Sequence, residues 1–181
     1  MTAAIRWRTS GVAHVFGDDI AHDNGMMAWK HVIERQTDPD ILVPCLFQGI
    51  DPDFAKRVKP GDFIVAGKRF GAGKPHTTAY VAMAALGLRV LCESSFDKVM
   101  RGAANLGVPI MANCLGISSE IRDGETICVD MATGEVARPD RAPLRYPPLQ
   151  PVFQQTIELG GRAGILKAWL ATHPEMASAY D

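Results

Sequence analysis

The chain has 181 residues, of which 47% are hydrophobic and 22% are charged, and its formal net charge at pH 7 is −1. This length and composition predict one globular domain, residues 1–181, and the near-neutral charge gives no reason to expect binding to nucleic acid or to a membrane. Because no apolar run reaches membrane-spanning length and no basic-then-apolar leader is present, a cytoplasmic location is expected.

The first third of the chain predicts a strand followed by two short helices. Residues 4–16 alternate loosely between apolar and polar, which favours a strand or hairpin. Residues 37–40, Thr-Asp-Pro-Asp, supply capping residues for a helix that runs to Phe47, and residues 51–58 begin a second helix. These two helices are expected to cover one face of a sheet.

The central stretch, residues 61–79, contains a strand, a glycine-rich turn and a helix start. Phe63 to Ala66 is an apolar run, and a run at helical spacing extends from Thr77 to Leu86 with Pro75 before it. This order is typical of an anion site, because glycines let the backbone approach a ligand and the first N–H groups of a helix point at it. An ordinary tight strand-to-helix connection has the same pattern.

Strand and helix signals then alternate. Residues 88–92 predict a strand, residues 93–105 a helix and residues 107–112 another strand, and this βαβ alternation favours a parallel sheet. Turn pairs at 123–124 and 133–134 predict a meander of short strands.

The C-terminal part predicts a connector and two helices. Residues 138–151 hold five of the 12 prolines and are expected to form an extended connector. Residues 152–171 predict a pair of helices hinged at Gly160 and Gly161.

The four cysteines, Cys45, Cys92, Cys114 and Cys128, lie far apart and form no Cys-x-x-Cys pair. Zinc and iron–sulfur ligands usually include such closely spaced pairs. We therefore expect that this chain alone binds no metal ion or cluster, and that its cysteines are buried free thiols.

Several segments together resemble a known family. The residues Pro-Gly-Asp at 60–62, Ala-Gly-Lys at 66–68 and Phe-Gly-Ala-Gly at 70–73 are similar to the small subunit of 3-isopropylmalate dehydratase, the swivelling domain of the aconitase superfamily. Residues 17–23 resemble the family's opening motif, Gly-Asp-Asn-Ile-x-Thr-Asp. The resemblance spans nearly the whole chain. It implies an α/β aconitase-type swivelling domain of three layers, with a mostly parallel central sheet flanked by helices.

The chain departs from the family directly after the glycines. Relatives carry Ser-Ser-Arg-Glu there, which supplies the catalytic serine and a substrate-binding arginine, whereas residues 74–77 of this chain read Lys-Pro-His-Thr. The resemblance also implies that Asp23 reaches the active site and pairs with a histidine of the large subunit. Lys30 lies in the place of the family's substrate-selecting loop, where an ammonium would answer a substrate carboxylate.

Two of the residues that differ from the family motif are candidates for a role in the reaction. Lys74 matches the first serine; in a water-excluded cleft beside Lys68 and Arg69, its ammonium would lose a proton and act as a base. His76 matches the arginine and would bind a carboxylate or exchange protons near neutral pH. The alternative is structural: Lys74 would complement the carbonyl groups of its loop, and His76 would be a surface residue in the first helical turn.

The candidate site therefore has Lys74 and Asp23 as catalytic residues and no metal ligand. The substrate-binding candidates lie around them: Gly71, Ala72, Gly73, Pro75, His76, Thr77, Arg69 and Lys30.

In the family, a large subunit holds a 4Fe–4S cluster, and the swivelling domain closes over it with the base that removes a proton alpha to a carboxylate. The resemblance implies such a large dehydratase subunit as partner, in a heterodimer or heterotetramer, and a small carboxylate as substrate. We interpret the chain as the small subunit of a two-subunit hydro-lyase, a dehydratase or isomerase of a hydroxy-di- or tricarboxylate, with an altered active-site loop. A non-catalytic docking or regulatory paralogue and a stand-alone small-anion-binding module remain the alternatives.

Overall fold

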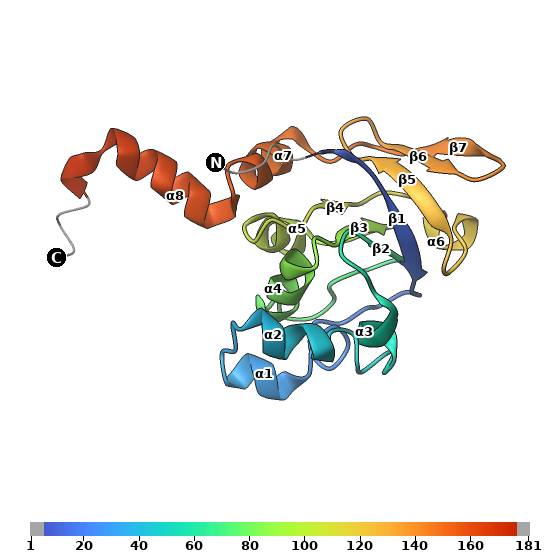
Figure 1. The fold of residues 1–181 in the computed structure, drawn as a ribbon, viewed down its shortest axis with the longest axis horizontal. Helices are drawn as coiled ribbons and strands as arrows, with labels where there is room; N and C mark the ends of the chain where they lie inside the picture. Colours follow the sequence, from blue (N-terminus) through green and yellow to red (C-terminus); the bar gives the residue numbers. More distant parts are fainter. Residues whose placement is uncertain (1–5, 177–181) are drawn as a thin grey trace.

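The computed structural model describes residues 6–176 and contains one seven-stranded sheet in the order β4-β3-β2-β1-β5-β6-β7 (Figure 1). Strands β1 to β4 pair in parallel, whereas the pairs β1–β5, β5–β6 and β6–β7 are antiparallel. The strands are β1 (Arg8–Val15), β2 (Phe63–Ala66), β3 (Arg89–Cys92), β4 (Ile110–Met111), β5 (Thr126–Asp130), β6 (Glu135–Arg138) and β7 (Arg141–Arg145).

The helices gather in two groups. In the first, α2 and α4 pack against each other and against the short 3-10 helix η1, which also contacts α3; in the second, α5 contacts α7 and α7 contacts α8. Helix α8 projects away from the rest of the molecule (Figure 1). The helices are α1 (Trp29–Ile33), α2 (Pro39–Leu42), η1 (Val43–Cys45), α3 (Phe54–Arg57), α4 (Thr78–Ala85), α5 (Asp97–Ala104), α6 (Ile117–Glu120), α7 (Pro151–Glu158) and α8 (Gly161–Thr172).

Strand β2 is the centre of the parallel half of the sheet. All four of its residues are fully buried, because β1 and β3 flank it and helices cover its faces. The glycine-rich loop leaves its carboxyl end and leads into α4. The parallel arrangement brings the ends of β1, β2 and β3 to one edge of the sheet, so the segments that follow these strands meet there.

Most predicted elements are confirmed, including the α/β class with helices flanking a central sheet. The strand at 63–66, the alternation from β2 to β4, the meander of β5 and β6 and the two C-terminal helices all form as expected. The prediction for residues 4–16 is confirmed from Arg8 to Val15; residues 4 and 5 lie outside the described part of the chain. Parallel and antiparallel pairings are equal in number, so the meander half of the sheet is larger than expected.

Three local predictions are wrong. The expected connector at 138–151 contains β7, an edge strand that tolerates Pro143 because an edge strand does not need every N–H group for pairing. The loop expected around Lys30 is the short helix α1. Helix α4 begins at Thr78 after the N-cap Thr77, so Pro75 and His76 precede the helix and do not form its first turn. Among residues 6–176 no helix is long and apolar enough to cross a membrane.

Candidate functional site

The glycine loop is fixed by backbone hydrogen bonds on both sides. The N–H groups of Gly71 and Ala72 both donate to the carbonyl of Ile20, at 2.9 and 3.0 Å, and the N–H group of His22 donates to the carbonyl of Ala72 at 3.0 Å. On the other side the N–H group of Phe70 donates to the carbonyl of Ser94 at 3.0 Å. The loop is therefore rigidly placed, and the amides of Gly71 and Ala72 are occupied within the chain.

Unbonded N–H groups begin one residue later. From Gly73 to Tyr80, none of the backbone N–H groups donates a hydrogen bond within the described residues, and the N-cap Thr77 makes no side-chain cap. The segment presents a run of donors with the partial positive charge of a helix N-terminus. An anionic oxygen would satisfy these donors.

Asp23 and His76 meet at the entrance to this segment. Oδ1 of Asp23 lies 3.1 Å from Nε2 of His76, although the two atoms are not aligned for a hydrogen bond with each other. Both atoms are buried, while the His76 side chain as a whole is 16% exposed and that of Asp23 is 37% exposed. The ring of Trp29 lies edge-on to His76, with centroids 5.5 Å apart. An imidazole beside a carboxylate at the surface can hold or exchange a proton.

A hollow of about 370 Å³ opens beside His76. Arg35 is exposed there and makes no ion pair with any residue between 6 and 176, and its φ of +51° is a left-handed conformation that few non-glycine residues adopt. Thr78 is buried and its Oγ1 has no hydrogen-bond partner. No lining residue is acidic, so the hollow suits an anion; it is lined by Val32, Arg35, Gln36, Thr37, His76, Thr77 and Thr78.

A second histidine lies under the glycine loop. The ring centroid of His22 is 6.5 Å from that of His76, and its Nε2 is 3.2 Å from the hydroxyl of Tyr80. Burial, with smaller contributions from His76 and Lys98, lowers the pKa of His22 from 6.5 to about 4. His22 is therefore uncharged at neutral pH.

The remaining candidates are placed differently. Lys74 is exposed and makes no hydrogen bond or ion pair within the described chain. The guanidinium of Arg69 forms a two-pronged ion pair with Asp19, which lowers the pKa of that carboxyl, so Arg69 is committed elsewhere. Lys30 is exposed on α1 and does not line the hollow. Thus Asp23, His76 and Thr77 come together, whereas Arg69 and Lys30 are not part of this cluster.

Sequence reasoning missed Arg35 and His22. Arg35 stands in a polar run, Glu-Arg-Gln, which has the composition of a solvated loop, and its position beside α4 depends on a contact between distant segments. His22 carried one signal: the family's opening motif has threonine at this position. That departure lies next to the departure at His76.

All four cysteines are free thiols, and the expectation that they are buried is confirmed for Cys92 and Cys114 but not for Cys45 and Cys128, which are only partly buried. Cys92 and Cys114 are fully buried, and burial raises the pKa of both thiols, that of Cys114 to about 12. Within the part of the chain that the structure describes, no group of three or more His, Cys, Asp or Glu residues could hold a metal ion.

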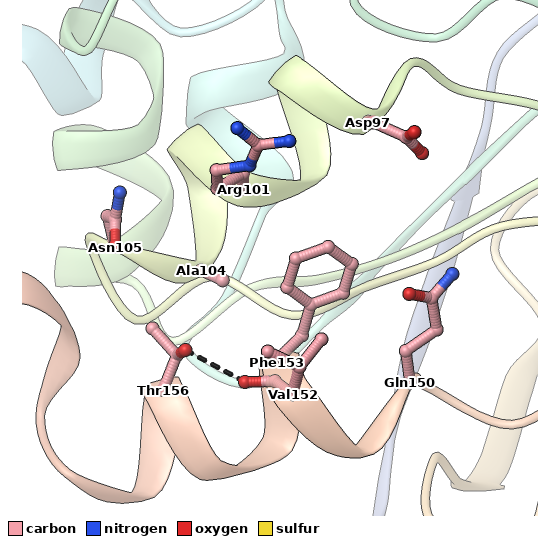
Figure 2. Close-up of a pocket in the computed structure, with 8 residues that line it drawn as sticks. All are labelled: Asp97, Arg101, Ala104, Asn105, Gln150, Val152, Phe153 and Thr156. Atoms are coloured by element: carbon pink, nitrogen blue, oxygen red, sulfur yellow. Dashed lines mark hydrogen bonds between the residues drawn. The ribbon is translucent and has the colours of Figure 1, made fainter.

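Another hollow, of about 540 Å³, lies between α5 and α7 (Figure 2). Its polar groups include Arg101 and Gln150, while Thr156 donates its hydroxyl to the carbonyl of Val152 at 2.8 Å. None of the residues proposed from the sequence lines this hollow, so we do not assign it to the site.

Comparison with known proteins decides the family. No family model matches the chain. The small subunit 1 of 3-isopropylmalate dehydratase from Methanopyrus kandleri is 35% identical over 159 residues, which cover 87% of this chain and 91% of that protein. The chain belongs to the 3-isopropylmalate dehydratase small-subunit family.

Two small subunits from a second organism are also similar to this chain. The isopropylmalate/citramalate isomerase small subunit of Methanocaldococcus jannaschii is 34% identical over 158 residues, 86% of this chain and 92% of that protein. The methanogen homoaconitase small subunit of the same organism is 38% identical over 128 residues, 70% of this chain and 71% of that protein.

The fold agrees with this family. A crystal structure of 3-isopropylmalate dehydratase from M. jannaschii matches with a TM-score of 0.78 at 30% identity, covering 93% of this chain and 99% of that one. The predicted family and the predicted swivelling-domain fold are both confirmed. Residues 74–77 of this chain read Lys-Pro-His-Thr, where the resemblance described above implies Ser-Ser-Arg-Glu.

Proposed function

We propose that this small-subunit family member is the swivelling half of a two-subunit hydro-lyase that acts on a hydroxy-di- or tricarboxylate. The proposal is supported by relatives named as small subunits of 3-isopropylmalate dehydratase, of isopropylmalate/citramalate isomerase and of methanogen homoaconitase. The partner would be a large dehydratase subunit, in a heterodimer or heterotetramer. When bound to that subunit, a 4Fe–4S cluster would supply the Lewis acid for the substrate hydroxyl, and this chain would supply none of its ligands.

The observation that carries the proposal is the contact between Asp23 and His76 beside the hollow that also contains Arg35. Imidazolium, guanidinium and free N–H groups at a helix start all bind carboxylate oxygens. A substrate with two or more carboxylates would bind with one carboxylate at His76 and a second at Arg35. The glycine loop would shape the wall, and Asp23 would hold His76 in place.

Lys74 would remove the proton alpha to a carboxylate. Closure of the large subunit over residues 73–77 would exclude water from its amine, and a desolvated amine is a competent base. The nitrogen would take the proton, the electron pair of the C–H bond would form the new double bond, and the hydroxyl would leave the adjacent carbon with the C–O electron pair as hydroxide, which takes up a proton to become water. Addition of water would reverse these steps.

The geometry favours a second candidate for the base. His76 has a carboxylate 3.1 Å from Nε2, and a base beside an orienting group is a common catalytic arrangement. In that case Lys74 would bind a substrate carboxylate. The effects of Lys74→Ala and His76→Ala on kcat and on KM would then be exchanged.

The function is tested by reconstituting the chain with its cognate cluster-bearing large subunit and assaying hydration and dehydration of a panel of hydroxy-di- and tricarboxylates. We expect turnover of at least one acid with both subunits and little with either alone. If an assembled complex with an intact cluster turns over none of the panel, the chain is a docking or regulatory paralogue. If no complex forms and the chain alone binds small dicarboxylates, it is an anion-binding module.

A further inference from the structure

The buried pair His22 and Tyr80 lies directly behind the surface pair Asp23 and His76. Tyr80 stands in the first turn of α4, and His22 lies in the segment that follows β1. The hydroxyl of Tyr80 and Nε2 of His22 are 3.2 Å apart, and the two rings meet edge to face with centroids at 5.4 Å. His22 thus links the segment that carries Asp23 to the helix that follows His76.

The His22 ring has little freedom. Its backbone N–H group is bonded to Ala72, and the ring lies beneath Gly71, where an added Cβ would be 3.3 Å from Nε2. The same Cβ would be 2.6 Å from Cγ1 of Val99 on α5. A ring packed in this way cannot turn without moving the loop, so its orientation is fixed by the fold.

The hydrogen bond between the two buried side chains joins two uncharged groups. Burial raises the pKa of the Tyr80 phenol, and burial lowers the pKa of His22 to about 4, so at neutral pH both groups are uncharged. Either Tyr80 donates to Nε2 of His22 and the ring proton lies on Nδ1, or the ring proton lies on Nε2 and is donated to the Tyr80 oxygen. Nδ1 itself has no hydrogen-bond partner among residues 6–176.

The His22 ring packs directly against the His76 ring. The two rings are nearly perpendicular, with centroids at 6.5 Å. The charged groups that face the two rings are Asp23, Arg35 after α1 and Lys98 on α5.

We propose that His22, held by Tyr80, is a positioning residue that keeps His76 against Asp23. The proposal rests on the proposed function only for the use made of His76. The arrangement itself is a property of the isolated chain, so it is testable without substrate, cluster or partner.

The test is ring-nitrogen NMR of the full 181-residue chain labelled with ¹⁵N, followed from pH 5 to 8. In the wild type we expect His22 to stay a single neutral tautomer. Tyr80→Phe removes only the hydroxyl, and it should release His22 into a mixture of tautomers. A wild-type His22 that is protonated at pH 7, or that is already a mixture of tautomers, would overturn the hydrogen bond to Tyr80.

Positioning is read from the His76 ring in the same spectra. Tyr80→Phe and His22→Leu are expected to displace the His76 titration curve by about half a pH unit or more, while His22→Gln, which stays uncharged and can still form a hydrogen bond with Tyr80, should leave it in place. His14→Gln is the matched control, because His14 is equally buried but is bonded to Asp62 at 2.9 Å. It should cost stability without moving the His76 signals.

The two outcomes are separable from the fate of the proposed function. If Tyr80→Phe and His22→Leu fold and leave the His76 curve unchanged, His22 is only a core residue and the positioning role is wrong. If the curve moves as expected while the reconstituted complex shows no turnover, the positioning role stands and the hydro-lyase assignment fails. Circular dichroism of each variant establishes that it is folded.

Discussion

Asp23 and His76 are 53 positions apart in the chain, yet Oδ1 of Asp23 lies 3.1 Å from Nε2 of His76. The contact exists because the segment after β1 is bonded to the loop after β2, through the amides of Gly71 and Ala72 and the carbonyl of Ile20. The segment that resembles the family's opening motif and the segment 74–77 therefore lie side by side.

The positions of His76 and Arg35 at one hollow predict that each contributes part of the free energy of substrate binding. His76→Ala and Arg35→Ala should each weaken binding of a dicarboxylate substrate or product analogue by about 1.5–3 kcal/mol, because each removes a charge-assisted hydrogen bond. That loss corresponds to roughly a 10- to 150-fold rise in Kd. Calorimetric titration of the reconstituted complex measures it. Lys167→Ala, an exposed change on α8, should leave the affinity as it is, and equal losses in all three variants would point to a nonspecific charge effect.

Two glycines of the loop offer a matched pair. Gly71 has φ of +80° and Gly73 has φ of +86°, so alanine is strained by about 1–2 kcal/mol at either position. At Gly71 the new Cβ would also approach Cγ1 of Val99 to 2.6 Å, whereas at Gly73 nothing lies within 4 Å. Overpacking should add about 1–3 kcal/mol to the loss of stability of Gly71→Ala. Urea unfolding measures the difference, and equal losses for the two variants would contradict the described packing.

His22 predicts a specific loss of stability in acid. Its folded-state pKa, about 4, lies below the ordinary 6.5, so between these values the unfolded chain binds more protons than the folded one. Stability should therefore be full above pH 6.5 and should fall by up to about 3 kcal/mol as the pH approaches 4. His22→Gln should remove this part of the pH dependence.

The control for the acid measurement is His173→Gln, since His173 lies on the surface after α8. Carboxyl groups whose pKa is lowered in the folded state also reduce the stability of the protein in acid. Asp62 is an example: burial raises its pKa, but hydrogen bonds from His14, Lys59 and Val12 lower it further than burial raises it. This contribution is the same in the wild type and in both variants. A His22→Gln curve parallel to the wild type between pH 4 and 6.5 would show that His22 is not buried as an uncharged ring.

Much of the fold was predictable because it depends on local patterns. Strand β2 was an uninterrupted apolar run, and α4 had apolar residues at helical spacing, so both were placed from the sequence within a residue or two. The first turn of α4 was placed slightly too early, because Pro75 suits a first helical turn, whereas the helix begins at Thr78 and His76, outside it, contacts Asp23. No local pattern reports such a contact.

Residues of the candidate site could be predicted only where the sequence matches motifs of the family. Asp23 and His76 were named because their motifs were in register with the family. Arg35 was not named, because it stands in a polar run whose neighbour in space, α4, is more than 40 positions away. The sequence also did not show that Arg69 pairs with Asp19, since a basic residue beside a glycine turn has the composition of an anion site whether or not it already pairs with an acid.

Replacement of residues 74–77 by Ser-Ser-Arg-Glu tests whether the native residues support a different reaction or have only lost the reaction of the family. We expect the fourfold variant to assemble with the large subunit and to lose turnover of the native substrate, because Lys74 and His76 are both gone. A gain of isopropylmalate isomerase activity would show that only these four positions had diverged. Native turnover that survives the replacement would contradict the assigned site.

The most direct measurement is the turnover number of the reconstituted complex carrying Lys74→Ala. If Lys74 is the base, kcat should fall by a factor on the order of 10² to 10⁴ while substrate binding survives, and Lys167→Ala, which removes an exposed lysine on α8, should leave kcat unchanged. A fall in kcat with His76→Ala instead would move the base to the Asp23–His76 pair. Wild-type turnover and affinity in both the Lys74 and the His76 variants would contradict the site, and the chain would then be a docking partner.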